Sequence, residues 1–367
     1  MQQSPSRRAG RRERLAKRAA KPEIDPCPPG QKGGRYRPLS EQEIKDIYAT
    51  TLRLLEELGI GEVPERLAER FTAIGARDNG SGRMLFPRGL VEEAIDAAAK
   101  TFVLHGRDES RSIEVGGDRV HFGTGGAAVQ TLDLDSGLYR PSTLRDLHDF
   151  TRLQDRLANV SWVTRCCIAT DVADPFDLDV NTAYALIRNT SKPTATAFTL
   201  AEHVGPIVQM FDIAAGGEGA FSRRPFMKAH ISPVISPMRY GEDAVDVTFE
   251  CIRHNIPLSC ITAAQAGATA PATLAGFLAQ SLAETLASLL MVHAIRPGHP
   301  MVFSNWPFVV DLRTGAFAGS GGETAVMNAA SAQISNWLGL PSGVAASMSD
   351  AKAIDAQYGA EKAMTSV

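Results

Sequence analysis

The stretch PLSCITAAQAGATAPATLAGFLAQSLAETLASLLMVHAIRPGHPMVFSNW, residues 257–306, holds two short apolar runs on either side of one long helical pattern. The outer runs, PLSCITA and PMVFSNW, have the length and composition of buried strands. The segment 272–295 between them is apolar but is interrupted by Gln280, Ser281, Glu284 and His293. Because such residues are costly in lipid, we expect a buried helix and not a membrane span. A strand, a helix and a second strand predict a βαβ unit with parallel strands.

The same alternation extends from residue 120 to the end of the chain. A helical segment follows each of the strand-like runs VHFGT (120–124), VSWVTRCCIA (160–169), TATAFT (194–199), FMKAHIS (226–232), PLSCITA (257–263), PMVFSNW (300–306) and SGVAASM (342–348). Repeated βα units predict an α/β fold, and we expect a (β/α)8 TIM barrel. Seven runs are one fewer than a closed barrel needs, so we predict a barrel that is C-terminally incomplete and lacks its last strand or two. A doubly wound sheet of seven strands is the alternative.

The residues before this barrel divide into two parts. Residues 1–39 combine a basic arm with a Pro/Gly-rich linker, which we expect to be disordered. Residues 40–118 are predicted to be a helical N-terminal extension that ends in a short hairpin. Its helices are expected near 40–58, 63–74 and 88–100. The catalytic barrel is assigned to residues 119–367.

Charge and cysteine content narrow the possible partners and the compartment. The net charge is −3, and the strongly basic segment 1–22 carries eight Lys or Arg against one acidic residue. A solvated arm is expected there, with no nucleic-acid partner for the chain as a whole. The five cysteines are an odd number without the spacing of a disulfide framework, which indicates a reducing cytoplasm.

Several separated blocks carry a more specific signal. They are HFGTGGAAVQTLDLDSGLYRPSTLRDL (121–147), ISPVISPMRYGEDAVDV (231–247), ITAAQAGATAPATLAGFLAQSLAETLASLLMV (261–292), SGGETAVMNAA (320–330) and SMSDAKAIDAQYGAEK (347–362). Together, from about residue 40 onward, they resemble the trimethylamine methyltransferase family of corrinoid-dependent enzymes. The resemblance implies a (β/α)8 barrel that moves a methyl group from trimethylamine, or from a quaternary amine such as glycine betaine, to the cobalt of a separate corrinoid protein. It also implies a role in one-carbon metabolism related to methanogenesis, cob(I)alamin-type acceptor chemistry on a partner protein, and a homo-oligomer without a metal of its own.

The chemistry of this reaction indicates which residues to look for. A quaternary ammonium leaves as a neutral tertiary amine, so the site mainly has to hold a cation whose charge disappears during transfer. Aromatic faces suit that task, and barrel sites lie at the carboxyl ends of the strands. The substrate-binding candidates there are Phe303, Asn305, Trp306, Phe308, His230, Arg239 and Gln265. Core packing is the competing interpretation for the phenylalanines and for His230, and a surface loop is the competing one for Arg239.

Two acidic residues near strand ends are catalytic candidates. Asp350 follows the last run and could pair with the substrate cation, or it could cap the next helix. Glu323 is the second candidate, although Ser320-Gly-Gly-Glu323 also has the S-x-x-E pattern of a capping box. Three glycines, Gly123, Gly125 and Gly126, are assigned to close approach of the cofactor to the backbone, with turn formation as the alternative.

Two other functions stay open. A zinc-dependent barrel methyltransferase would use Cys and His ligands, and Cys166, Cys167, His230 and Cys260 lie on or near three predicted strands. Adjacent cysteines do not easily share one tetrahedral metal, and no C-x-C or C-x2-C spacing occurs, so we expect no bound metal. The other alternative is a non-catalytic paralogue or fragment that binds an amine and transfers nothing.

Overall fold

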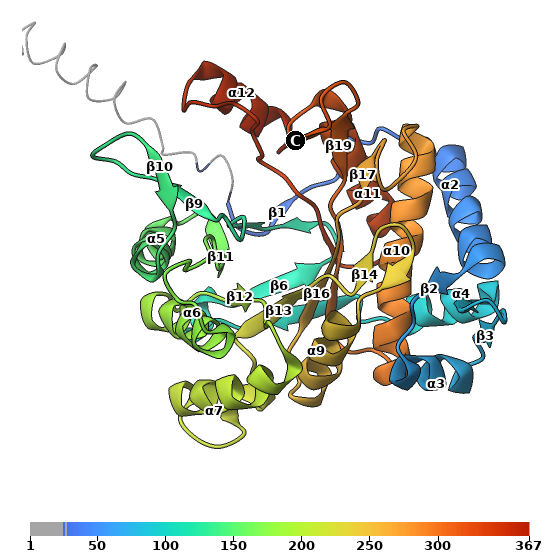
Figure 1. The fold of residues 1–367 in the computed structure, drawn as a ribbon, viewed down its shortest axis with the longest axis horizontal. Helices are drawn as coiled ribbons and strands as arrows, with labels where there is room; N and C mark the ends of the chain where they lie inside the picture. The colour runs from blue at the N-terminus through green and yellow to red at the C-terminus, as the bar shows by residue number, and fades with distance from the viewer. Residues whose placement is uncertain (1–24, 26–27, 367) are drawn as a thin grey trace, which may run out of the picture.

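The centre of the molecule is a curled parallel sheet of seven strands in the order β21–β18–β16–β13–β12–β11–β8 (Figure 1). The structure is a computed structural model that describes residue 25 and residues 28–366. The strands are β8 (Phe122–Gly123), β11 (Val160–Thr164), β12 (Thr194–Thr196), β13 (Met227–Ile231), β16 (Leu258–Thr262), β18 (Met301–Asn305) and β21 (Ser342–Gly343). All seven predicted strands are therefore confirmed, and they follow one another in the sheet in chain order.

Helices connect these strands and pack on one side of the sheet. They are α5 (Leu144–Arg156), α6 (Pro175–Asn189), η3 (Ala201–His203), α7 (Val204–Ala215), α8 (Ala220–Arg223), α9 (Glu242–Arg253), α10 (Leu274–Ile295) and α11 (Gly322–Trp337). Figure 1 shows the sheet curling with helices outside it, which is consistent with part of a TIM barrel. Within the described residues, the edge strands β8 and β21 each pair with one neighbour and not with each other.

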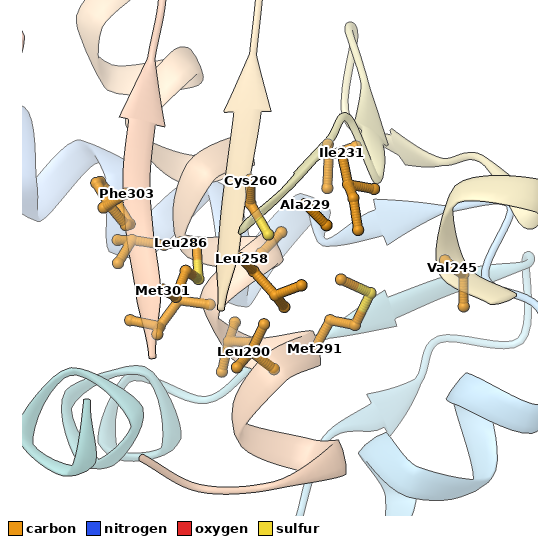
Figure 2. Packing of buried hydrophobic residues seen from close by; sticks show 14 of the residues in the cluster. Ala229, Ile231, Val245, Leu258, Cys260, Leu286, Leu290, Met291, Met301 and Phe303 are labelled. Carbon is orange, nitrogen blue, oxygen red and sulfur yellow. The ribbon is translucent and has the colours of Figure 1, made fainter. Parts of the chain in front are cut away.

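Helix α10 is the central element of the core. It is long and apolar enough to cross a membrane by length and composition, but 83% of its most apolar window is buried inside the protein. Figure 2 shows side chains of α10 against those of β13, β16 and β18, among them Leu286, Leu290, Met291, Ala229, Leu258, Cys260, Met301 and Phe303. Burial of each large apolar side chain stabilises the fold by about 1.5–3 kcal/mol. The prediction of a buried helix is confirmed.

The segment 40–118 is mixed α/β and not simply helical. Its predicted helices form as α2 (Glu41–Arg53) with η1 (Leu54–Leu58), α3 (Glu65–Ala73) and α4 (Arg88–Ala97). Between them, β2 (Ile60–Gly61), β3 (Arg77–Asp78) and β4 (Arg83–Leu85) join β14 (Val234–Ile235) and β15 (Arg239–Tyr240) in a five-stranded sheet. The sequence pattern does not predict this sheet, because its strands are two or three residues long and two of them come from the segment after residue 118.

Short strands outside the central sheet form several smaller sheets. The predicted hairpin is confirmed as β5 (Thr101–Leu104) and β6 (Ile113–Gly116), which precede and follow η2 (Glu109–Arg111). In the predicted linker, β1 (Gln31–Lys32) pairs with β7 (Arg119–Val120), while most of the basic arm lies outside the described residues. The remaining elements are β9 (Gln130–Leu132), β10 (Tyr139–Pro141), β17 (Gln265–Ala266), β19 (Phe308–Asp311), β20 (Ala316–Ala318) and α12 (Ala356–Met364).

Candidate active site

The strand register divides the central sheet into two chemically different faces. Cys260 pairs with Phe303, and both belong to the core that packs on α10. Neighbouring residues along a strand point to opposite sides, so Ser259, which pairs with His230, points the other way. This second side, which we call the inner face, carries polar and aromatic side chains: Trp162, Thr164, Lys228, His230, Ser259 and Ser304.

Lys228 is the most unusual of these residues. It lies on β13 and is only 4% exposed. Within the part of the chain that the structure describes, its ammonium donates no hydrogen bond and forms no ion pair with a carboxylate. Its ammonium lies 3.8 Å from the centroid of the Trp162 ring, a cation–π contact. Burial lowers the pKa of Lys228 to about 7, because the charged form has lost its water. The side chain is therefore poised between ammonium and amine near neutral pH.

The indole of Trp162 occupies the space that a side chain at position 123 would fill. A Cβ at Gly123 would lie 1.9 Å from Cε2 of the indole, far inside any real contact. Gly123 therefore makes room for Trp162, which is a different reason for this glycine from the predicted approach of a cofactor. At Gly126 a Cβ would contact Thr164 and Arg165 at 3.3 Å, whereas at Gly125 it would meet nothing within 4 Å.

His230 lies beside this pair on the inner face. Its ring is 5.6 Å from that of Trp162 in an edge-to-face arrangement, and its Nδ1 lies 3.5 Å from the hydroxyl of Thr164. The Nε2 atom is buried without a partner among the described residues. Burial, and then the charges of Lys228 and Arg165, lower the pKa of His230 well below its usual value. The imidazole is therefore neutral, with one ring nitrogen free to meet a ligand.

Negative charge is scarce around these basic groups. Burial lowers the pKa of Arg165, which follows β11, and Asp179 opposes that shift. Asp179 already accepts hydrogen bonds from the backbone and hydroxyl of Thr199, at 2.6 and 2.9 Å, and contacts His203 Nδ1 at 2.8 Å. On the neighbouring strands β16 and β18, the hydroxyls of Ser259 and Ser304 lie 2.9 Å apart and satisfy each other.

Comparison with known proteins identifies the family. A family model described as trimethylamine methyltransferase matches residues 7–367. This chain belongs to the trimethylamine methyltransferase family. It is 28% identical over 341 residues to a glycine betaine methyltransferase of Desulfitobacterium hafniense, a match that covers 92% of this chain and 70% of the relative.

Two trimethylamine methyltransferases give similar matches. One, from D. hafniense, is 30% identical over 327 residues, and one from Methanosarcina barkeri is 29% identical over 334 residues. Each match covers 89% of this chain and 66% of the relative. The chain thus spans about two thirds of the length of these relatives.

The structure of this family member places two predicted substrate residues away from the inner face. Phe303 is 2% exposed in the core against α10. Asn305 lies on the same side of β18, and its Nδ2 donates to the hydroxyl of Ser281 on α10 at 3.0 Å. The alternation along the strand is the reason, since it turns Val302 and Ser304 inward and leaves Phe303 and Asn305 outward.

Three other candidates lie together beyond the carboxyl ends of the strands. The backbone of Trp306 donates to Thr262 O at 2.8 Å, directly after β16 and β18. Gln265 is in register with Phe308 in the three-stranded sheet β17–β19–β20. The Phe308 ring packs on Phe317 at 4.7 Å between centroids. Trp306 is partly exposed there, as a rim residue should be.

Arg239 is not part of this group. It lies on β15, and its guanidinium forms a 2.8 Å ion pair with Glu62, which is exposed to solvent. Such exposed pairs contribute about 0–1 kcal/mol. The surface-loop interpretation therefore describes Arg239 better than the predicted carboxylate clamp.

Asp350 binds backbone just ahead of α11. Its carboxylate accepts from Gly319 N at 2.9 Å, from Ser320 N at 3.0 Å and from Ser320 Oγ at 2.9 Å. The same hydroxyl lies 3.0 Å from Glu361, whose pKa is lowered to about 2 by hydrogen bonds from Gln357 and Ser349. Asp350 and Glu361 thus fix the loop before α11. The alternative that Asp350 caps the next helix is wrong, because α12 begins at Ala356 with Asp355 as its N-cap.

The predicted capping box at Ser320 and Glu323 is wrong. Helix α11 begins at Gly322 with Gly321 as its N-cap, and no side chain caps it. The physical reason is that the Ser320 hydroxyl is already committed to the acidic pair of Asp350 and Glu361. Glu323 is exposed in the first turn, where its charge suits the helix dipole.

The residues of the zinc alternative do not converge. His230 lies on the inner face, whereas Cys260 on the next strand lies on the α10 side. Within residues 28–366, no group of three or more His, Cys, Asp and Glu side chains could hold a metal ion.

A surface hollow lined by Glu65, Glu69 and Met84 lies on α3 and is not part of the inner face.

Sequence reasoning found His230 but missed Lys228 and Trp162. The signal was present in FMKAHIS, where Met227, Ala229 and Ile231 alternate with Lys228 and His230. This period of two predicts that lysine and histidine share the face opposite the apolar residues.

Proposed function

We propose that this protein transfers a methyl group from a methylated amine, trimethylamine or a quaternary amine of the glycine betaine kind, to the cobalt of a corrinoid protein. The observation that carries the proposal is the match to the trimethylamine methyltransferase family over residues 7–367. It agrees with relatives named for trimethylamine and for glycine betaine. The corrinoid protein is a separate partner and acts as the second substrate.

The proposed reaction is a displacement at the methyl carbon. The C–N bond breaks and its electron pair stays on nitrogen, while a pair from cob(I)alamin-type cobalt forms the new bond to carbon. A quaternary ammonium thereby becomes a neutral tertiary amine, and no proton has to be supplied. Trimethylamine has to react as its protonated form, trimethylammonium, so that it leaves as neutral dimethylamine. The protein has to position the methyl carbon in line and to exclude water from the reduced cobalt.

The residues of this chain suit those two tasks. The carboxyl ends of the parallel strands are where ligands bind in barrel folds, and Trp306 and Phe308 lie there. Aromatic rings hold a methylated ammonium that cannot donate a strong hydrogen bond. The inner face below them, with Trp162 and Lys228, offers fixed polar groups in a largely buried setting.

Methyl transfer can be measured directly. The protein is incubated anaerobically with cob(I)alamin and, in separate reactions, with trimethylamine, glycine betaine or choline, and methylcobalamin is followed by its absorbance. We expect methylcobalamin with at least one amine and none without protein. Amine binding without any transfer would favour the non-catalytic alternative and reject the proposed reaction.

A further inference from the structure

Two buried lysines in this protein differ in their hydrogen bonding. Lys192, before β12, is 7% exposed, and its ammonium donates to the carbonyl oxygens of Gln154 and Leu157 at 3.0 and 2.7 Å. Lys228 is 4% exposed, and its only described polar contact is the face of the Trp162 ring. Buried ammonium groups are normally hydrogen-bonded, because an unpaired one costs several kcal/mol. Among the described residues, the ammonium of Lys228 makes no hydrogen bond.

Within residues 28–366, no carboxylate forms an ion pair with Lys228. The strand on one side contributes Ala195 in direct register, and β11 beyond it contributes Trp162 and Thr164. On the other side, the inner face continues with Ser259, whose hydroxyl is paired with Ser304. Arg165, which directly follows β11, carries a positive charge like Lys228. Both charges lower the pKa of His230.

We propose that Lys228 binds the carboxylate of a zwitterionic quaternary amine, so that the substrate class is a betaine and not trimethylamine itself. This inference rests on the proposed function and refines it. A carboxylate provides the acceptors that the ammonium lacks, and a charge-assisted hydrogen bond of this kind is among the stronger ones in proteins. The neutral His230, whose Nε2 is unpartnered among the described residues, can donate the second hydrogen bond to the same group.

Electrostatics on the inner face favours this class over a simple cation. An amine that carries only positive charge would meet Lys228, which repels it. A betaine places its negative end against Lys228 and directs its methylated nitrogen away from that charge. Because ligand methyl groups have to reach the carboxyl ends of the strands, where Trp306 lies, the carboxylate acts as the anchor and the ammonium as the reacting end.

Choline provides the matched test ligand. It shares the trimethylammonium group of glycine betaine and replaces the carboxylate by an uncharged hydroxymethyl group. Binding of both ligands is measured by isothermal titration calorimetry at pH 6.5 on the full chain, as wild type, Lys228→Met and Lys192→Met. Methionine keeps most of the length of lysine and removes its charge.

We expect wild type to bind glycine betaine at least about tenfold more tightly than choline, and Lys228→Met to abolish that preference. Lys192→Met should keep it, since that lysine is already satisfied by backbone carbonyls. Lys228→Met should also raise the melting temperature, because it removes an unsatisfied buried ammonium, whereas a merely structural lysine would lower it on removal. Equal binding of the two ligands by wild type, no betaine binding, or an unchanged preference in Lys228→Met overturns the proposal.

The methyl-transfer assay separates this failure from failure of the proposed function. Efficient transfer from trimethylamine that Lys228→Met leaves unchanged would reject the role of Lys228 and support the reaction. Selective binding of glycine betaine through Lys228 without methyl transfer to cobalt would reject the reaction and support carboxylate recognition.

Discussion

The ammonium of Lys228 lies 3.8 Å from the ring centroid of Trp162, although the two residues come from strands β13 and β11 with β12 between them. A desolvated cation–π contact contributes about 2 kcal/mol, which is less than the several kcal/mol that burial of an ammonium costs. The contact therefore orients the lysine without fully stabilising its charge. This imbalance is the reason that the pKa of Lys228 falls to about 7.

Folding stability should rise with pH above neutrality because of this lysine. Its pKa is about 7 in the folded protein and near 10.5 when unfolded, so between these values the unfolded chain binds the extra proton. The slope from this one group is at most about 1.4 kcal/mol per pH unit in that window. Burial also lowers the pKa of His230, which lies beside Trp162, and of Arg165, which follows β11, and the charge of Lys228 adds to the shift at His230.

Urea unfolding at pH 7, 8 and 9 measures this slope, with Lys228→Met as the matched control. Wild type and variant should converge in unfolding free energy as the pH rises. Parallel curves for the two proteins would show that Lys228 is not abnormally titrating.

Gly123 should tolerate no side chain, whereas its neighbour Gly125 should. A Cβ at Gly123 would lie 1.9 Å from the indole of Trp162, and overpacking of this kind costs about 1–3 kcal/mol. We expect Gly123→Ala to lower the melting temperature and to shift the tryptophan fluorescence. Gly125→Ala, whose Cβ would meet nothing within 4 Å, should match wild type in both measurements. Equal effects of the two substitutions would contradict this packing.

The order of elements was predictable from the sequence because apolar runs and helical segments alternate over the whole barrel region. The side on which a strand residue lies was harder. Phe303 and Trp306 both looked like mouth residues in FSNWPF, yet alternation sends Phe303 to the α10 side. Burial of Lys228 is hard to predict, because a lysine in a strand-like run is compatible with an exposed edge, and only the paired neighbours reveal that it is buried.

Asp350 illustrates a second limit of prediction. A carboxylate after a strand is compatible with catalysis and with binding to backbone N–H groups, and the choice depends on the loop it faces. That loop, at Gly319 and Ser320, is about thirty residues earlier in the chain, so no local pattern could indicate the contact. The same long-range contact removed Ser320 from the expected capping box.

Phe303 and Trp306 should respond to substitution in different ways. Phe303→Ala removes a 2%-exposed core ring and should lower the free energy of unfolding by about 3–5 kcal/mol. Trp306→Ala should change stability much less and weaken amine binding, because Trp306 is partly exposed beyond β18. Chemical denaturation and calorimetric titration with glycine betaine measure the two effects. Unchanged affinity in Trp306→Ala would remove this tryptophan from the site.

Asp350 should stabilise the loop before α11 and take no part in the chemistry. Asp350→Ala deprives Gly319 N, Ser320 N and the Ser320 hydroxyl of their acceptor, which should cost about 1–3 kcal/mol. Hydrogen exchange at Gly319 and Ser320 should accelerate in this variant, while the exposed neighbour Lys352, changed to alanine, should leave exchange unaltered. If Asp350→Ala instead abolished methyl transfer with exchange at those two amides unchanged, the carboxylate would have to be reassigned to the reacting amine.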